Sequence, residues 1–259
     1  MSRPRNYQTE AIIIKKIKLG EAGRILTLYT PHLGKIQAVA KGVRRPRSKM
    51  AGHLELLTHS QVSLARGRNL DTVTGSQTIA GFLPLKSDLK LTSYALYAVE
   101  LVEQFTADHD ANQPLFGLLL KTMHQLCQET NHELTLRHFE LHLLDLVGYR
   151  PQLRQCVACH KPLEPGTNLF SPRAGGALCP GCQQSQPLVY PLSVDALKVL
   201  RWLQGNDLSA ASRLKITPPL SRELELVVRG YLRYLLEREV KSTAWLDTLR
   251  EQDNPIALL

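Results

Sequence analysis

The sequence predicts an α+β fold with three parts: an N-terminal β-barrel, a helical bundle domain and a four-cysteine module inserted into the bundle. Three observations support this prediction. Short strand-like runs fill the first third of the chain, the apolar period then changes from two to 3.6 residues, and four of the five cysteines form two C-x2-C pairs. We place the barrel at residues 1–82, the helical domain at 83–150 and 188–259, and the module at 151–187.

The barrel is predicted from five β-rich runs that are bounded by glycine, proline and asparagine. The runs are Ala11–Ile17, Arg24–Thr30, Lys35–Ala40, Leu56–Leu64 and Asp71–Ile79. Five short strands in about 75 residues suit a closed or nearly closed barrel, such as the five-stranded OB-fold that binds oligonucleotides. A partly open β-sandwich is the alternative.

Amphipathic helices are expected in most of the remaining chain. Apolar residues recur at helical spacing between Asp88 and Gly148, and again from Leu224 to Leu236. Pro114 suits the first turn of one helix, and Ser193 is the expected N-cap of another. We expect these helices to pack into one bundle.

The two cysteine pairs predict a metal site. They are separated by 19 residues, which falls within the spacing of structural zinc sites. Four thiolates complete a tetrahedron around zinc and leave no open position for catalysis. The prolines and glycines between the pairs favour a hairpin or loop. We assign one structural zinc ion to Cys156, Cys159, Cys179 and Cys182, which gives the module a zinc-ribbon-like character.

A different interpretation of the first pair remains open. Cys156 and Cys159 are followed by His160, which is also the C-x2-C-H pattern of haem attachment. Haem would leave Cys179 and Cys182 without a role, and we expect no export signal in this chain. An iron–sulfur cluster and metal-free thiols are further alternatives.

One histidine pair could suggest a metalloprotease. His138 and His142 lie four residues apart on a predicted helix, with Glu140 between them. In an HExxH motif the glutamate directly follows the first histidine, whereas Glu140 lies about 200° around the helix from His138. We expect these histidines to be surface or packing residues.

Positive charge is concentrated in the N-terminal third. Residues 1–80 contain 14 Lys and Arg against 4 Asp and Glu, and the rest of the chain contains 18 against 19. A basic module joined to a near-neutral body is typical of a polyanion-binding protein, although a solvated surface is the alternative. Guanidinium forks match phosphate oxygens. The candidate DNA-binding residues lie near strand ends and in turns: Lys15, Lys16, Lys18, Lys35, Lys41, Arg44, Arg45, Arg47, Lys49, Arg66 and Arg68.

The scarcity of aromatic residues limits how this module could bind. Tyr7 and Tyr29 are the only Phe, Tyr or Trp residues before Phe82, and Tyr29 is expected in the core. Barrels that bind single strands tightly stack bases on aromatic side chains. We therefore expect mainly phosphate contacts, which position a strand without reading its sequence.

Several function classes are not expected. The longest apolar runs fall far short of the roughly 20 residues of a membrane span, so we expect a cytoplasmic, nucleoid-associated protein. The phosphate-binding motif G-x4-G-K-[S/T] does not occur in the sequence, and no set of catalytic side chains can be argued from it. We expect a protein that is not an enzyme.

Five motifs in a fixed order run through the chain. Glu10–Ile14, Gly20–Pro31 and Gly34–Ser48 lie in the predicted barrel, Phe139–Tyr149 leads to the first cysteine pair, and Phe170–Gly176 precedes the second. With these motifs the chain resembles the RecO family of bacterial DNA-repair and recombination mediators over essentially its whole length. The resemblance implies an N-terminal OB domain, a helical bundle and an inserted zinc-ribbon-like element.

The resemblance also implies a function in the RecF pathway. RecO-like proteins bind single- and double-stranded DNA and anneal complementary strands without ATP. They act with RecR, and often RecF, to load RecA onto DNA coated by single-strand-binding protein (SSB). They also contact the acidic C-terminal tail of SSB through the helical part. For that contact we name Arg222, Arg229 and Arg233, with a solvated helix face as the alternative.

Two other functions need consideration. An RNA-binding zinc-ribbon protein acting on structured RNA would also need a basic barrel and four cysteines. A metalloenzyme would need an exchangeable position on its metal, which four cysteine ligands do not leave.

Overall fold

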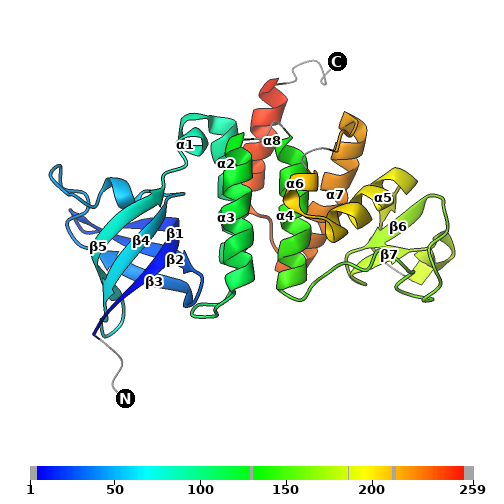
Figure 1. Ribbon diagram of the computed structural model, residues 1–259. Helices are drawn as coiled ribbons and strands as arrows, with labels where there is room; N and C mark the ends of the chain where they lie inside the picture. The colour runs from blue at the N-terminus through cyan, green and yellow to red at the C-terminus, as the bar shows by residue number, and fades with distance from the viewer. Residues whose placement is uncertain (1–4, 129–130, 186, 212–213, 254–259) are drawn as a thin grey trace. The chain divides into compact units, whose positions relative to one another are not determined.

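The computed structural model describes residues 5–128, 131–185, 187–211 and 214–253, and the chain divides into two compact units (Figure 1). The first unit, residues 1–127, contains a barrel and three helices. The second, residues 128–259, contains the remaining helices and the four cysteines. The division falls between two helices that we expected in one bundle, so the single bundle stays a prediction.

The barrel is closed and consists of five strands in the order β1-β2-β3-β5-β4. Its strands are β1 (Asn6–Leu19), β2 (Gly23–Thr30), β3 (Gly34–Ala40), β4 (His59–Ala65) and β5 (Asp71–Ala80). All neighbouring strands are antiparallel except β3 and β5, whose parallel pairing closes the barrel. The predicted α+β fold with an N-terminal barrel of the OB type is confirmed, and the open sandwich is wrong.

β1 is longer than the predicted run because it pairs with two partners. Its first half pairs with β4 from Asn6 to Ile12, and its second half pairs with β2 from Ile12 to Leu19. Between Ile13 and Lys15 the register shifts by one residue, which is a β-bulge. A bulge bends a strand and increases its twist, and this allows β1 to pair with both β4 and β2 as the barrel closes.

β4 begins later than predicted. Leu56 was expected in the strand, but residues 52–54 form the short 3-10 helix η1 and a turn follows, in which Leu57 has a φ of 59°. Leu54 and Leu57 are 1% and 2% exposed, and Leu54 belongs to the barrel core. The segment is therefore apolar because it covers the barrel interior, and it does not join the sheet.

Three helices complete the first unit: α1 (Pro84–Ser87), α2 (Leu89–Phe105) and α3 (Gln113–Gln128). Tyr29 is fully buried, as predicted, but its ring packs outside the barrel against Phe116 of α3, with ring centroids 6.2 Å apart. Pro114 is the second residue of α3, as its position in the sequence predicted. Cys127, near the end of α3, is only half-buried.

The second unit contains α4 (His132–Leu146), α5 (Val194–Gly205), α6 (Leu208–Ala211), α7 (Pro218–Leu236) and α8 (Lys241–Asp253). α4 packs against α5, α6 and α7. The predicted N-cap is confirmed, because the Ser193 hydroxyl accepts a hydrogen bond from the Ala196 amide. Glu223 of α7 accepts hydrogen bonds from the amide and the hydroxyl of Ser193, which ties the start of α5 to α7.

A small sheet in the order β7-β6-β8 lies between these helices in the sequence. Its strands are β6 (Asn168–Ser171), β7 (Gly176–Leu178) and β8 (Tyr190–Leu192), and β6 and β7 form the predicted hairpin. Because β8 pairs with β6, the sheet continues past residue 187, where we placed the end of the module.

None of the helices in the described ranges has both the length and the apolar character that are needed to cross a bilayer.

Candidate nucleic-acid interface and metal centre

The basic loop, which we define as Lys41–Lys49, leaves the end of β3 and is anchored to the barrel. Gly42 adopts a φ of 65°, and the next residue, Val43, is 5% exposed and belongs to the barrel core. The Arg44 amide donates to the carbonyl of Ala22 in the β1–β2 turn, at 3.1 Å. The loop backbone is therefore held in place against that turn.

Inside the basic loop two further turns hold the backbone. The Arg45 amide donates to the Gly42 carbonyl at 3.1 Å, and the Ser48 amide donates to the Arg45 carbonyl at 2.9 Å. The cationic side chains of the loop are all exposed: Lys41, Arg44, Arg45, Arg47 and Lys49. Cations on an ordered backbone lose less conformational freedom on binding, so this loop is a candidate phosphate-binding surface whose backbone is ordered in advance.

Lys35 does not belong to that surface. Its side chain is 12% exposed, and its ammonium donates to the carbonyls of Glu103 and Thr106 at 2.7 and 2.8 Å. These carbonyls lie at the C-terminus of α2, where a cation is favoured by the helix dipole. Asp108 lies 3.6 Å from the same ammonium. Lys35 therefore attaches α2 to the barrel.

Two of the three predicted cations of β1 form ion pairs with acidic residues of the chain. Lys15 forms an ion pair with Glu103 of α2, and Lys16 forms one with Glu55. Lys18 is exposed near the β1–β2 turn. Both acidic partners are distant in the sequence, so no local signal in the sequence revealed them.

The β4–β5 turn carries the last two predicted cations. Arg66 and Arg68 are exposed, and the Arg66 guanidinium lies 4.7 Å from the centroid of the Tyr7 ring. The Tyr7 hydroxyl donates to Asp71, which also accepts a hydrogen bond from the Gly67 amide. Tyr7 thus binds residues of the β4–β5 turn through its hydroxyl and its ring, and Tyr29 is buried. Neither tyrosine of the barrel therefore offers a free ring face on which a base could stack.

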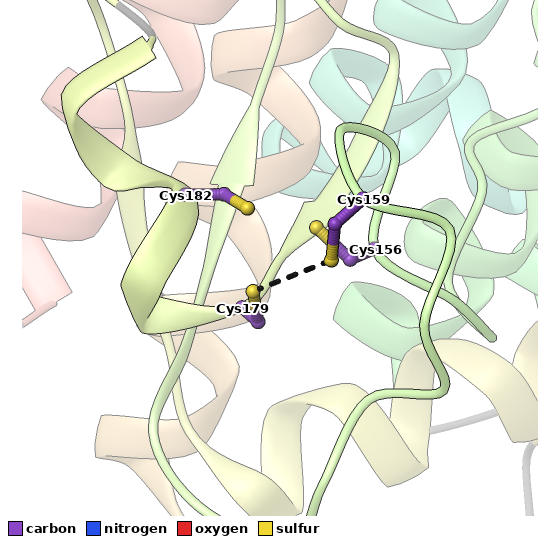
Figure 2. Close-up of side chains that lie close together, drawn as sticks. All are labelled: Cys156, Cys159, Cys179 and Cys182. Carbon is purple, nitrogen blue, oxygen red and sulfur yellow. Dashed lines mark hydrogen bonds between the residues drawn. The ribbon is translucent and has the colours of Figure 1, made fainter.

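The second candidate site is the cluster of four cysteines. The sulfur atoms of Cys156, Cys159, Cys179 and Cys182 all lie within 4.8 Å of one another, and those of Cys159 and Cys179 are 3.8 Å apart. Figure 2 shows the sulfurs converging from two sides, with Cys156 and Cys159 on one loop and Cys182 on a helical turn. That turn is η2 (Pro180–Ser185). The cluster can hold a metal ion.

Backbone pairing explains why the two cysteine pairs meet. The Ala177 amide of β7 donates to the Gln152 carbonyl, and the Val157 amide donates to the Ala177 carbonyl, at 2.7 and 3.0 Å. These bonds fasten the loop of the first pair to the hairpin that leads to the second. A Cβ atom at Gly176 would lie 2.4 Å from the Gln152 carbonyl oxygen, so only glycine allows this close approach.

The thiols of the cluster differ in acidity. Burial raises the pKa of Cys156, but backbone amides that donate to its sulfur outweigh burial and lower the pKa to about 6. The hydrogen bond with Cys179, and then burial, raise the pKa of Cys182 to about 12. Without a cation, ionisation of one thiol therefore disfavours ionisation of the others. A bound divalent cation relieves this conflict, because its positive charge lowers the pKa of every thiol that coordinates it.

The histidine pair serves packing. The rings of His138 and His142 stack with centroids 4.0 Å apart, and their Nε2 atoms donate to the carbonyls of Asn206 and Leu203. Burial and the neighbouring His142 lower the pKa of His138 to about 4, so it is neutral at pH 7. Glu140 forms a buried ion pair with Arg137 at 2.6 Å. The structure agrees with the expected packing role.

The three arginines named for tail binding have different surroundings. Arg229 lies 2.8 Å from both Glu225 and Asp247, and Arg233 contacts Glu239 and the Tyr190 hydroxyl. Arg222 is exposed near the start of α7. An acidic peptide at this face would have to compete with the acidic groups of the chain itself.

The fold and these two sites define a protein of the OB-barrel class that carries a four-cysteine module. A family model described as Recombination protein O N terminal matches residues 1–82, and one described as Recombination protein O C terminal matches residues 86–244. The chain belongs to the RecO family, as its motifs indicated. Membership of this family supports a role in DNA repair.

Curated relatives named DNA repair protein RecO are similar to this chain over nearly its whole length. One from Dehalococcoides mccartyi is 49% identical and covers 96% of this chain and 98% of its own. One from Roseiflexus sp. is 46% identical, over 96% of this chain and 88% of its own. One from Symbiobacterium thermophilum is 34% identical, over 94% and 98%.

Proposed function

We propose that this protein is a mediator of DNA repair and homologous recombination in the RecF pathway, which binds single- and double-stranded DNA and anneals complementary strands. The observation that carries this proposal is the anchored basic loop, whose five cations are exposed on the barrel of a RecO-family chain.

Annealing on such a surface needs no chemical step by the protein. Two complementary strands repel each other through their phosphates, and a cationic surface that binds both lowers this repulsion and releases counterions. The chain contains no G-x4-G-K-[S/T] motif to couple nucleotide hydrolysis to this process. The protein acts as a binding mediator and is not an enzyme.

Membership of the RecO family is the support for the proposed partners. RecR, and in some settings RecF, would act with this chain to load RecA onto single strands coated by SSB. The SSB tail, an acidic peptide that ends in a hydrophobic residue, would bind the α7 face that includes Arg222, Arg229 and Arg233. Cations next to apolar side chains such as Leu226, which is 55% exposed, support this assignment.

The metal in the cysteine cluster is proposed to be one structural zinc ion. A tetrahedron with zinc–sulfur bonds of about 2.3 Å separates its sulfurs by about 3.8 Å, and the Cys159–Cys179 distance of 3.8 Å has this value. Haem attachment uses only two cysteines, and it gives no reason for all four to converge.

Annealing of DNA and RNA pairs, measured side by side without any nucleotide, tests the proposed function. We expect the protein to accelerate DNA annealing at least about tenfold in low salt, and to lose this effect as salt screens the phosphates. Acceleration of RNA annealing alone would instead favour the RNA-binding alternative. Absence of acceleration with either pair would refute the proposal.

For the tail site, Arg222→Glu is the cleaner substitution because it breaks no ion pair seen between Arg222 and the described residues. We expect it to weaken binding of an acidic peptide with a hydrophobic C-terminus about fivefold or more, since it reverses a charge that faces the peptide. Arg238→Glu, also exposed, is the control. If the single variant Arg222→Glu and the double variant Arg229→Glu with Arg233→Glu both bind the peptide with the affinity of the wild type, the assignment to α7 is wrong.

A further inference from the structure

Three aliphatic side chains form a row across the outside of the barrel. Ile17 of β1 lies opposite Ile25 of β2, and Ile25 lies opposite Val39 of β3. Directly paired residues point to the same face of a sheet. The β-bulge between Ile13 and Lys15 reverses the alternation, so Ile13 points into the core while Ile17 points outward. We call these three residues the aliphatic row.

The aliphatic row remains accessible to solvent. Ile17 is 50% exposed, and Ile25 and Val39 are partly exposed. Leu19, two residues further along the same face of β1, is 41% exposed. Elsewhere on the outer face, Ile12 and its partner Tyr29 are fully buried, and the Tyr29 ring packs against Phe116 of α3. The helices of the first unit therefore bury one part of this face and leave the aliphatic row in contact with water.

Cationic segments border the aliphatic row on two sides. The basic loop begins two residues after Val39, and its Arg44 is bonded to the β1–β2 turn between Ile17 and Ile25. On the other side Val39 pairs with Thr72, which follows the β4–β5 turn containing Arg66 and Arg68. Since strands lie about 4.8 Å apart, the path from β1 to β5 across the row is about 14 Å long.

We propose that the bases of a single DNA strand pack on the aliphatic row while the phosphates of that strand contact the basic loop. This inference rests on the proposed DNA binding and names the surface that receives the bases. Charge complementarity identifies the occupant, because an apolar strip bordered by cations fits a ligand with apolar faces on an anionic backbone. The tyrosines of the barrel are buried or bound to the β4–β5 turn, so this strip replaces the aromatic platform of other OB barrels.

Contact with base faces would add to the affinity for single strands without adding to the affinity for duplexes. In a duplex the base faces are covered by their neighbours, and only unstacked bases can lie flat on a protein surface. Aliphatic side chains provide no hydrogen bonds to base edges, so the contact is tolerant of sequence. A duplex would bind through its phosphates alone.

Substitution of one row residue combined with removal of the bases tests this inference. The full-length protein is titrated with a single strand of mixed sequence and with an abasic strand of the same length, which keeps the phosphates. Ile17→Thr keeps the β-branched shape but removes apolar surface. Ile79→Thr is the matched control, because Ile79 is also an isoleucine of a barrel strand and is 52% exposed.

We expect Ile17→Thr to weaken binding of the normal strand about five- to tenfold, which corresponds to the loss of one or two buried methylene equivalents. Binding of the abasic strand and of a duplex should stay within about twofold, and the slope of affinity against salt should not change. Ile79→Thr should behave as the wild type. Ile17→Tyr should bind the normal strand more tightly than the wild type, because it adds a stacking surface.

Other outcomes would overturn the inference. If Ile17→Thr binds the normal strand as the wild type does, the bases do not lie on the aliphatic row. If Ile17→Thr weakens the normal and the abasic strand equally, the row contacts the backbone only. If the wild type binds no strand at all, the proposed DNA binding fails, and this failure is separate from the first two.

Discussion

Replacing Cys179 with serine is expected to abolish stoichiometric metal binding and to unfold the four-cysteine module. The four sulfurs lie within 4.8 Å of one another, and four thiolates held this close repel one another unless a cation lies between them. Structural zinc contributes about 10–16 kcal/mol of apparent binding free energy in isolated zinc fingers, which is far more than a small hairpin gains by folding. The wild type should contain one equivalent of zinc by elemental analysis and should show no haem absorption band.

The thermal unfolding of the variant should show an early transition, or a large fall in the midpoint, relative to the wild type. Cys127→Ser is the control, because Cys127 lies in α3 and outside the cluster. The DNA affinity of the Cys179→Ser variant should change less than its stability, since the closed site only holds the module together. Less than about half an equivalent of zinc in the wild type would contradict the assignment.

Replacing Arg44 and Arg45 with alanine should lower DNA affinity for every sequence and reduce its salt dependence. Each phosphate contact contributes a slope of about 0.7 for single strands and 0.9 for duplex in a plot of log affinity against log salt. Loss of two contacts should therefore reduce the slope by about 1.4 to 1.8. If the electrostatic contribution vanishes near 1 M salt, affinity at 0.1 M falls roughly 25- to 60-fold.

The matched control for this variant removes two charges elsewhere. Lys121 and Lys215 are exposed and lie outside the barrel, so Lys121→Ala with Lys215→Ala makes the same change in net charge. The control should keep the wild-type slope to within about half a unit. If the arginine variant also keeps the wild-type slope, with an unchanged circular dichroism spectrum, the main DNA surface lies outside the basic loop.

The sequence predicted those parts of the sites that depend on residues close together in the chain. The spacing of the cysteine pairs predicted that their four sulfurs meet, and they do. A C-x2-C turn directs two thiols to one point, and the intervening hairpin brings the two turns together. The basic loop was recognisable for a similar reason. It contains no acidic residue, and its glycine and proline favour an exposed loop.

Contacts between distant segments could not be predicted in this way. Lys16 and Lys35 were assigned to the DNA surface because they lie near the ends of predicted strands in the basic N-terminal third. Their partners, Glu55 and the C-terminus of α2, come close only after the barrel has closed and the helix has packed on it. Charge counting along a chain therefore overestimates the cations that are available to a ligand.

The aliphatic row illustrates a different limit. Strict alternation along β1 would place Ile13 and Ile17 on the same, inward face. One inserted residue at the bulge reverses the phase, and only the register with β2 shows that Ile17 points outward. A sequence pattern identifies such a residue as core, whereas the paired strands identify it as surface.

Hydrogen–deuterium exchange of the full chain, with and without a single strand, tests the central claim most directly, because it locates the DNA surface on the molecule. We expect the strand to slow amide exchange in the basic loop, in the β1–β2 turn and in the strand segments that carry Ile17, Ile25 and Val39. The amides of α4, α5 and α7 should exchange as in the free protein. Protection confined to those helices, with an unchanged barrel, would contradict the account.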